Sequence, residues 1–308
     1  MAQEVDPDMY TYPFQLTKTM HRQPYDDILP SNPSNSQKGK IVIITGAYGG
    51  IGAAAASVWA RAGASVVLTG RKADQLAKVE KETKAVATDP SANIISVTVD
   101  VTIESQVQNL YTQVQKTFGR SADTLISNAG SGGGPPAPLG QIPWNEITDV
   151  FNSHLLGTTL MSKYFISSQS TPEDPVGTIV YITSGLSAII VPGTSPYSIS
   201  KLAGQRLMEY LDAEYPHLRT FSLSPGIIQT GMTSDMFRPF AKDHVELPGM
   251  MALYLSQERA DFLKGGFVGI NWDIKELEAN KEEIVEKKLL KIHWMPAKFG
   301  QGGHPFGA

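Results

Sequence analysis

Cysteine is absent from this 308-residue sequence. Disulfide bonds, thiolate metal sites and cysteine nucleophiles are therefore excluded together, and we expect no metal site. No apolar run approaches the roughly 20 residues of a membrane-spanning helix, and the N-terminal region lacks the continuous apolar stretch of a signal peptide. These absences predict a soluble, unsecreted protein, with the cytoplasm as its expected compartment.

An excess of positive charge is also missing, since 26 Lys and Arg face 30 Asp and Glu, for a formal net charge of -4. A chain without a basic field is not expected to take nucleic acid or an anionic membrane as its main partner. Hydrophobic residues make up 41% of the chain, which is enough for a large core. We expect one large α/β domain with extensions, because such domains run to about 250 residues.

Proline, serine and asparagine are frequent in residues 1–38, which we predict to be an N-terminal arm and linker. A main domain that holds the active site is predicted over residues 39–270, and a C-terminal extension over residues 271–308. The arm either packs on the body through its aromatic residues or forms a loose tail. Those aromatic residues are Tyr10, Tyr12, Phe14 and Tyr25.

A glycine-rich turn follows the first buried strand pattern. The β-branched run at residues 41–44 is typical of a strand buried on both faces of a parallel sheet, and an alanine-rich helix is predicted over residues 53–62. Between them, Gly46 permits a tight turn, while Gly50 and Gly52 let the backbone approach phosphates and the helix pack on the strand. The helix N-terminus adds free N–H groups, so we predict a pyrophosphate site. A turn without a ligand is the alternative.

The second predicted strand, residues 65–69, ends in Gly70-Arg71-Lys72 and carries no carboxylate there. A carboxylate at this strand end accepts hydrogen bonds from the adenosine ribose and repels a 2′-phosphate. Its absence, together with the guanidinium of Arg71, favours NADP(H) over NAD(H). The alternative is that Arg71 is only a solvated residue at a helix start.

Further strands are predicted at residues 94–99, 124–127, 178–183, 219–223 and 265–270, separated by helices at residues 73–87, from near 103, at 144–168, 196–215 and 274–290. This alternation predicts an α/β fold with a doubly wound parallel sheet, helices on both faces, and ligands at the carboxyl edge of the strands. At that edge, Asp100 either meets an adenine amino group or caps the next helix. The loop 131–136 either borders a substrate pocket or is a connector.

The long segment 227–248 is apolar but broken by turn residues, which is typical of a substrate loop, although a purely structural excursion also fits. Apart from Arg238, no cation is placed to bind an anionic substrate. Burying an unpaired charge costs several kcal/mol, so we expect a neutral, ring-bearing or long-chain substrate. The expected pocket residues are Leu186, Ile189, Ile190, Pro192, Met232, Met236, Phe237 and Phe240.

Tyr197 and Lys201 lie four residues apart on a helix that Pro196 can open, so they share one face. A nearby ammonium lowers the pKa of a phenol from its usual value of about 10. Ser184, at the end of the predicted strand 178–183, can hold a carbonyl oxygen beside that phenol. Such a set suits proton transfer to or from an oxygen while hydride moves at the adjacent carbon. Alone, the Tyr-x-x-x-Lys pair also fits an ordinary helix face.

These motifs together resemble the short-chain dehydrogenase/reductase family over about residues 38–270, and the arm and Asn271-Trp272-Asp273 resemble its fungal members. The resemblance implies a Rossmann-type sheet of about seven strands and a nicotinamide cofactor. It also implies that Tyr197 is the general acid/base, that Ser184 orients the carbonyl, and that Lys201 holds the ribose and lowers the pKa of Tyr197. The cofactor contacts it implies are Gly46, Tyr48, Gly49, Gly50, Ile51, Gly52, Arg71, Asp100, Val101, Asn128, Ala129, Gly130, Tyr197, Lys201, Pro225, Gly226, Ile228 and Thr230.

One position departs from the family pattern. The family usually has an Asn three residues before the glycine that corresponds to Gly157, where it supports a proton-relay water, but this sequence has His154 there and Asn152 two residues earlier. A histidine can hold a water or carry a proton near pH 6.5. The alternative is a buried, hydrogen-bonded histidine with no relay role.

We therefore predict an NADP-dependent ketone reductase or alcohol dehydrogenase that acts on a neutral small molecule of the secondary-metabolite or fatty type. Two alternatives stay open: a non-redox dehydratase or isomerase, and an NADP-sensing binding protein without turnover. The intact Tyr197 and Lys201 argue against the sensor. By family resemblance, the helix at residues 144–168 and the helix after Tyr197 are expected to build a homodimer or homotetramer.

Overall fold

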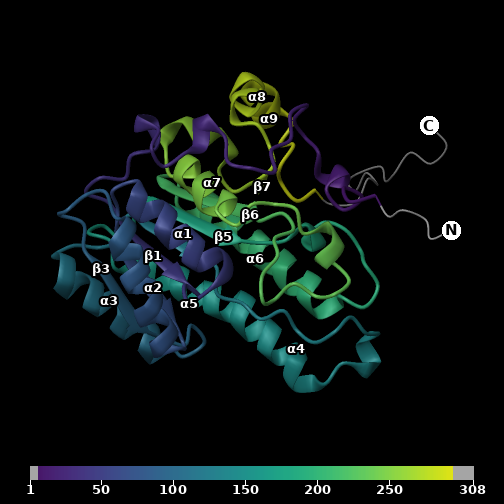
Figure 1. Cartoon of the computed structure of the whole chain (residues 1–308), viewed down its shortest axis with the longest axis horizontal. Coiled ribbons are helices and arrows are strands. Elements are labelled where there is room, and N and C mark those ends of the chain that lie inside the picture. The colour runs from purple at the N-terminus through teal and green to yellow at the C-terminus, as the bar shows by residue number, and fades with distance from the viewer. Residues whose placement is uncertain (1–5, 294–308) are drawn as a thin grey trace, which may run out of the picture.

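In the computed structural model, which describes residues 6–293, seven parallel strands form a sheet in the order β3-β2-β1-β4-β5-β6-β7 (Figure 1). The strands are β1 (Ile41–Thr45), β2 (Ser65–Gly70), β3 (Ile94–Thr98), β4 (Thr124–Ser127), β5 (Gly177–Ile182), β6 (Leu218–Ser224) and β7 (Phe267–Gly269). The predicted fold class is confirmed, and each predicted strand matches one in the structure. The last strand is shorter than predicted because Gly265, at φ +66°, belongs to the preceding turn.

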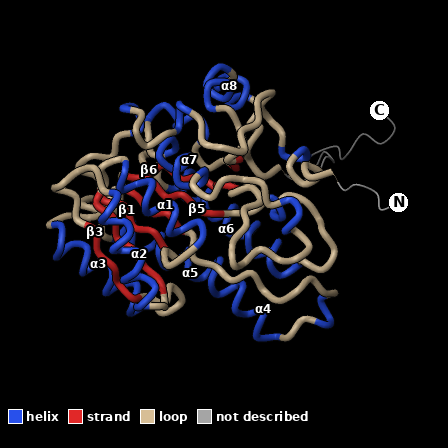
Figure 2. Tube along the Cα trace, in the orientation of Figure 1, coloured by secondary structure: helices blue, strands red, loops and turns tan. Residues whose placement is uncertain are grey.

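Helices cover both faces of this sheet, as Figure 2 shows. They are α1 (Gly50–Arg61), α2 (Ala73–Val86), α3 (Glu104–Phe118), α4 (Trp144–Phe151), α5 (Gly157–Ser167), α6 (Ser195–Glu214), α7 (Leu247–Leu255), α8 (Ile274–Ala279) and α9 (Lys281–Glu286). Alternate residues of β1 point into different layers. Val42 and Ile44 pack with α1, α2 and α7, whereas Ile41 and Ile43 pack with α3, α5 and α6. This two-sided burial explains the unbroken apolar run in the sequence.

The order of the strands reverses between β1 and β4, and the loops that leave these two strands define a crevice at the carboxyl edge of the sheet. The hydroxyl of Thr45, the last residue of β1, joins the two loops by accepting hydrogen bonds from the backbone N–H groups of Asn128 (2.9 Å) and Ala129 (2.8 Å). The fold therefore brings the glycine turn and the Asn-Ala-Gly turn to one place.

Two predicted helices are interrupted. The helix expected over residues 144–168 consists of α4 and α5 joined by a π-helical turn, Asn152–Leu156. The helix expected over residues 274–290 is split into α8 and α9 at Asn280, whose side-chain amide donates to the Glu276 carbonyl at 2.7 Å. Asparagine competes with the helix backbone in this way, which explains the break.

The part of the arm that is described, residues 6–38, packs on the body, so the loose-tail interpretation is wrong for it. Ile28 is fully buried, and Met20 forms an antiparallel bridge with Trp272. Figure 1 shows the arm, in purple, beside the C-terminal segment, in yellow. The first five residues of the arm and residues 294–308 of the predicted C-terminal extension lie outside the described residues.

Across residues 6–293, no helix is both long enough and apolar enough to cross a membrane.

Candidate active site

Ser184 follows β5 at the carboxyl edge of the sheet. Its Oγ accepts a hydrogen bond from the Leu186 backbone N–H at 3.2 Å, which begins a short 3-10 turn, Gly185–Ser187. Because that bond uses a lone pair of the oxygen, the hydroxyl proton stays free to be donated. Ser184 lines the pocket and can donate its hydroxyl proton to a ligand there.

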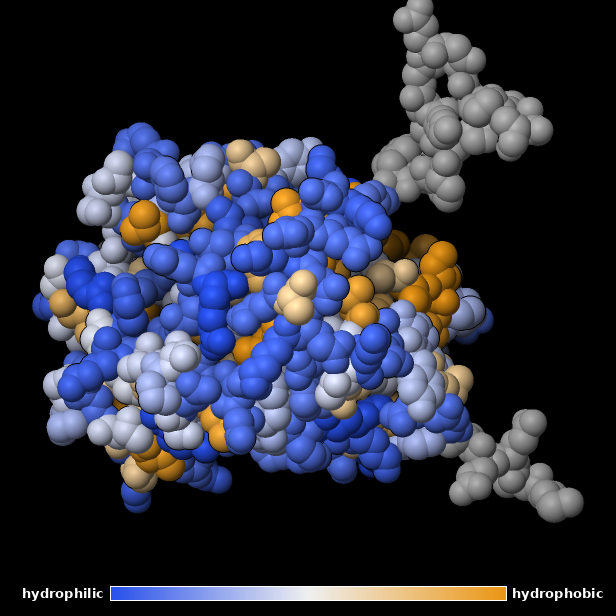
Figure 3. Space-filling view, turned by 90° about the horizontal axis from the view of Figure 1, so that it is seen from above, coloured by the Kyte–Doolittle hydropathy of each residue, from blue (hydrophilic) through white to orange (hydrophobic). Residues whose placement is uncertain are grey.

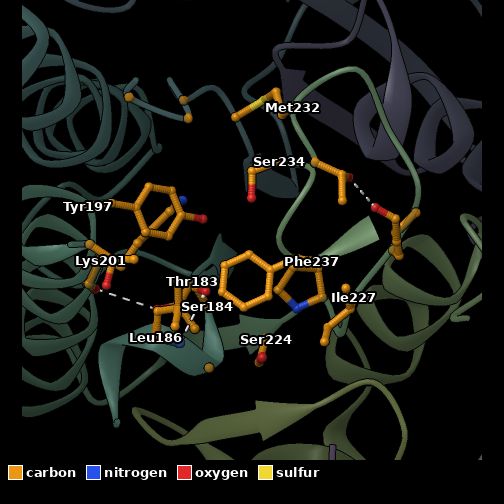
Figure 4. A pocket seen from close by; sticks show the side chains of 18 of the residues that line it. Thr183, Ser184, Leu186, Tyr197, Lys201, Ser224, Ile227, Met232, Ser234 and Phe237 are labelled. Carbon is orange, nitrogen blue, oxygen red and sulfur yellow. Dashed lines mark hydrogen bonds between the residues drawn. The ribbon is translucent and has the colours of Figure 1, made fainter. Parts of the chain in front are cut away.

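Tyr197 and Lys201 lie on the first turns of α6, and Pro196 occupies the start of this helix as predicted. The Lys201 ammonium donates to the Ile182 carbonyl at 2.8 Å and lies 5.7 Å from the centre of the Tyr197 ring. Figure 4 shows Tyr197, Lys201 and Ser184 around one pocket, with the segment 232–237 on its other side. The structure therefore brings the three predicted residues together.

Burial controls the ionisation of this pair. Burial lowers the pKa of Lys201 to about 7. Burial also raises the pKa of Tyr197, and the neighbouring Ser184 hydroxyl only opposes that shift. The direction for Tyr197 is opposite to the one implied by the family resemblance. Desolvation is the largest cause of this shift in the protein alone.

His154 is fully buried in the π-helical turn, and both of its ring nitrogens are used within the protein. Its Nε2 accepts from the Ser131 backbone N–H at 3.2 Å, so its Nδ1 carries the proton and donates to Ser200 Oγ at 2.9 Å. Ser200 in turn donates to the Tyr197 carbonyl at 2.7 Å. His154 does not line the pocket. This arrangement favours the second interpretation, a buried histidine that positions the Ser131 loop and α6.

Burial lowers the pKa of His154 to about 2, with the Lys201 charge as a smaller cause. An unfolded histidine has a pKa of about 6.5, so below that pH the unfolded chain binds a proton that the folded chain does not. The contribution of His154 to the free energy of unfolding is therefore fully present above pH 6.5. It falls by about 1.4 kcal/mol per pH unit as the pH decreases from 6.5 toward 2.

We expect the variant His154→Asn to lose this acid sensitivity. Between pH 6.5 and pH 5, its free energy of urea unfolding should fall by about 2 kcal/mol less than that of the wild type. The control is His217→Asn, because His217 is exposed on the surface. A decline with pH that is the same in all three proteins would show that His154 is protonated in the folded state.

The glycine turn has the shape of a phosphate cradle. A Cβ on Gly52 would lie 2.5 Å from the Gly46 carbonyl oxygen, so only glycine lets α1 pack this closely on the turn. Gly46 and Gly50 have φ values of +65° and +52°, which favour glycine. By contrast, nothing lies within 4 Å of a Cβ on Gly49, so the backbone before α1 is open. This open backbone at a helix N-terminus fits a pyrophosphate.

Asn128 supports this cradle from β4. Its side-chain amide donates to the Thr45 carbonyl at 2.9 Å. The amide nitrogen is thus used to hold the glycine turn, while the residue also lines the pocket. Other expected cofactor residues that line the pocket are Ile51, Gly130, Tyr197, Lys201, Pro225, Gly226, Ile228 and Thr230. Val101 does not line the pocket. Its side chain packs closely against Gly157 of α5 instead.

The end of β2 explains the missing carboxylate. A Cβ on Gly70 would lie 2.5 Å from the Tyr48 ring, so this ring occupies the place of a side chain. The Lys72 ammonium lies 5.4 Å from the centre of the same ring, which adds a second cation beside Arg71. Arg71 is mostly exposed, and its Nη1 is 3.9 Å from Asp100 Oδ2. The sequence reasoning missed Lys72, although it is the next residue in the chain.

Asp100 does not cap α3 through its side chain. Its Oδ1 accepts from the backbone N–H of Thr102 at 3.0 Å and from the Thr102 hydroxyl at 2.7 Å. The cap position belongs to Ile103, which makes no capping hydrogen bond. The other carboxylate oxygen of Asp100, Oδ2, instead faces the guanidinium of Arg71.

The pocket itself has a volume of about 290 Å³. Of the eight residues expected to line it, Leu186, Ile189, Met232 and Phe237 do so. Ile190, Pro192, Met236 and Phe240 do not line it: Ile190 is 96% exposed, and Phe240 is buried against Tyr10. Arg238 is also outside the pocket, since it points to solvent and pairs with Asp235 at 2.9 Å.

Several residues that line the pocket were not predicted. Tyr10 and Phe14 of the arm line it, as does Trp272. Glu146 of α4 is the only carboxylate among the described lining residues. The aromatic residues of the arm were the available signal, but nothing in the sequence indicated where they pack.

Comparisons with known proteins agree with this geometry. A family model described as short chain dehydrogenase matches residues 40–239. Short chain dehydrogenase pigC from Monascus ruber is 31% identical over 92% of this chain and 94% of its own length, and short chain dehydrogenase pgmD from Aspergillus terreus is 31% identical over 90% and 93%. The crystal structure of a short-chain type dehydrogenase/reductase from Mycobacterium marinum aligns with a TM-score of 0.69 at 26% identity, covering 77% of this chain and 96% of that one. Sheet order, motifs and relatives lead to one conclusion: this chain belongs to the short-chain dehydrogenase/reductase family of oxidoreductases.

Proposed function

We propose that this protein is an NADP(H)-dependent reductase or dehydrogenase that interconverts a ketone and an alcohol in a neutral small molecule. The observation that carries the proposal is the convergence of Ser184, Tyr197 and Lys201 on one pocket, which Ile51 of the glycine turn also lines. A bound nicotinamide cofactor supplies the hydride for reduction and accepts it for oxidation. The residues of the chain then have to position the carbonyl and handle one proton.

In the direction of reduction, the Ser184 hydroxyl donates a hydrogen bond to the carbonyl oxygen and orients it. Tyr197 donates its phenolic proton to the same oxygen as negative charge develops there. Lys201, fixed by the Ile182 carbonyl, then stabilises the tyrosinate that is left. In the direction of oxidation, Tyr197 takes the proton from the alcohol.

The preference for NADP(H) is supported by the end of β2. Arg71 and Lys72 offer two cations to a 2′-phosphate, and Tyr48 covers the position from which a carboxylate would repel it. Asp100 partly neutralises Arg71 at 3.9 Å. We therefore expect a preference for NADP(H) and not an exclusive requirement.

The substrate class is supported by the charge of the pocket. Lys201 is the only cation among its described lining residues, and it is already held by a backbone carbonyl. A carboxylate or phosphate on the substrate would meet Glu146 without a partner cation, which costs several kcal/mol. A neutral ring or chain instead gains about 25 cal/mol for each Å² of apolar surface buried.

A panel of NADPH-oxidation assays tests this proposal. It should include neutral cyclic ketones, acyl chains, phosphorylated sugars and keto acids, and we expect consumption with the neutral compounds. A preference for the anionic compounds would overturn the substrate class. Tight NADPH binding without oxidation across the panel would instead favour the non-redox alternative, a dehydratase or isomerase.

We also propose that the protein is a homodimer or homotetramer. Large apolar side chains are exposed on α4, on the π-helical turn that follows it, and on the neighbouring helix α6: Trp144 (75%), Leu156 (43%), Ile199 (54%) and Tyr210 (60%). Light scattering should therefore give at least twice the chain mass of 33.4 kDa. A monomer at micromolar concentration would contradict this expectation.

A second group of apolar side chains is exposed at one end of the face in Figure 3.

A further inference from the structure

Residues 8–22 of the N-terminal arm reach the substrate pocket, although they precede the glycine turn by more than twenty positions in the chain. Tyr10, Thr11 and Phe14 all line it. Phe14 lies beside Gly185, next to Ser184, and Tyr10 lies beside Phe237. Phe237 belongs to residues 227–243 of the predicted substrate loop, which are called the loop 227–243 below. The arm is therefore placed to contact whatever binds beside the catalytic residues.

Phe14 packs on the backbone next to Ser184. Two atoms of its ring lie only 2.8 Å from the place where a Cβ on Gly185 would be, so Gly185 leaves room for this ring. The Phe14 carbonyl accepts from the Trp272 indole N–H at 2.7 Å, and the ring stacks on Phe267 at 6.0 Å between centroids. Phe14 is thus a fixed part of the wall.

Tyr10 holds the loop 227–243. Its ring makes edge-to-face contacts with Phe237 at 5.3 Å and with Phe240 at 4.8 Å between centroids. Phe237 itself lines the pocket, as Figure 4 shows. Such aromatic pairs have a specific geometry, so the position of Phe237 depends on the ring of Tyr10.

A charged network fixes the same loop at its base. Asp243 is buried; its Oδ1 pairs with Arg22 Nη1 at 3.1 Å and its Oδ2 accepts from the Ile227 N–H at 2.7 Å, which joins the two ends of the loop. The other side of the Arg22 guanidinium contacts Asp8 and the Thr11 hydroxyl, at 2.7 Å for the latter. The arm and the loop are therefore one connected unit.

We propose that the arm residues 8–22 are a specificity-determining part of the substrate site, in which Tyr10 clamps the loop 227–243 and Phe14 forms a wall for a ring of the substrate. This deepens the proposed function and rests on it for the substrate class. The clamp itself does not depend on turnover. Because the rings of Phe14, Phe237 and Trp272 converge on the pocket, the occupant is a neutral fused-ring ketone and not a flexible acyl ketone.

Amide hydrogen exchange of the full-length protein tests the clamp without a substrate. In Tyr10→Ala, the amides of Phe237 and Phe240, which donate to Ser234 and Phe237 carbonyls, should exchange about tenfold faster than in the wild type. Tyr10→Phe keeps the ring and should match the wild type. Tyr12→Ala is the control, because Tyr12 is exposed and outside the pocket. Unchanged exchange in Tyr10→Ala, or equal acceleration in Tyr12→Ala, would overturn the clamp.

Kinetics with two neutral ketones test the wall. With NADPH, the wild type should prefer 2-tetralone, a fused-ring ketone, to 2-decanone, and Phe14→Ala should reduce the ratio of their kcat/KM values at least fivefold while the Kd of NADPH stays within twofold. An unchanged ratio, or a wild type that prefers 2-decanone or reduces neither ketone, would overturn the ring assignment. The exchange experiment needs no ketone and no turnover, so failure of the proposed reaction is distinguishable from failure of the clamp.

Discussion

Replacing Tyr197 with phenylalanine should lower kcat by about 10³-fold and change the Kd of NADPH far less. General acid or base catalysis by a positioned side chain contributes about 10²- to 10⁴-fold, and the phenol is the acid beside Ser184 in this pocket. The substitution removes the proton but keeps the ring, which packs edge-to-face on His154 at 5.3 Å. The pocket should therefore keep its shape. Steady-state kinetics and NADPH titration measure both quantities.

Tyr181→Phe is the matched control for this experiment. Tyr181 lies in β5, with the Lys201 ammonium 5.2 Å from its ring centre, yet it does not line the pocket. Its buried hydroxyl has no hydrogen-bond partner among residues 6–293, so its removal should leave kcat within twofold. If both variants lost the same activity, or if Tyr197→Phe kept a tenth of kcat, the assigned role of Tyr197 would be wrong.

Replacing Arg71 with alanine should weaken NADPH binding about tenfold and change NADH binding less than twofold. Only NADPH carries the 2′-phosphate, and a charge-assisted hydrogen bond contributes about 1.5 to 3 kcal/mol, less where the side chain is exposed. Arg71 is 68% exposed and Lys72 remains beside it, so the effect belongs at the lower end of that range. Calorimetric titration with each cofactor measures the two affinities.

The control for Arg71 is Lys78→Ala on α2. It removes one positive charge from a side chain that is 78% exposed, so it reports the effect of net charge alone. Both affinities should stay near the wild-type values in this variant. Equal losses of NADPH and NADH binding in Arg71→Ala would refute the assignment of Arg71 to the 2′-phosphate.

Local sequence patterns were sufficient to predict the sheet. The run Ile41–Ile44 is apolar on both faces, and the glycine turn after it has the spacing that lets Gly52 approach Gly46. Ser184 and Tyr197 were also predictable, because a strand end and a helix start carry their own signals in the chain. Features that depend on neighbouring residues along one element can be inferred from sequence alone.

The outer wall of the pocket depends on contacts between distant segments. Tyr10 and Phe240 are far apart in the sequence, and neither carries a local signal of the other. The expected lining residue Ile190 instead points to solvent. The direction in which burial shifts the pKa of Tyr197 also has no local signal, since the desolvation that raises it arises from the whole packed site. These properties follow from tertiary packing, which periodicity does not encode.

The central claim is that this protein transfers hydride between a nicotinamide and a carbonyl carbon with Tyr197 as the proton donor. Its most direct test uses NADPH deuterated at the transferring position of the nicotinamide ring, a set of neutral cyclic ketones, and mass spectrometry of the products. We predict one deuterium on the carbinol carbon of the alcohol formed by the wild type, and at least 100-fold less of that alcohol with Tyr197→Phe. Tight binding of NADPH with no deuterium in any product would contradict the claim.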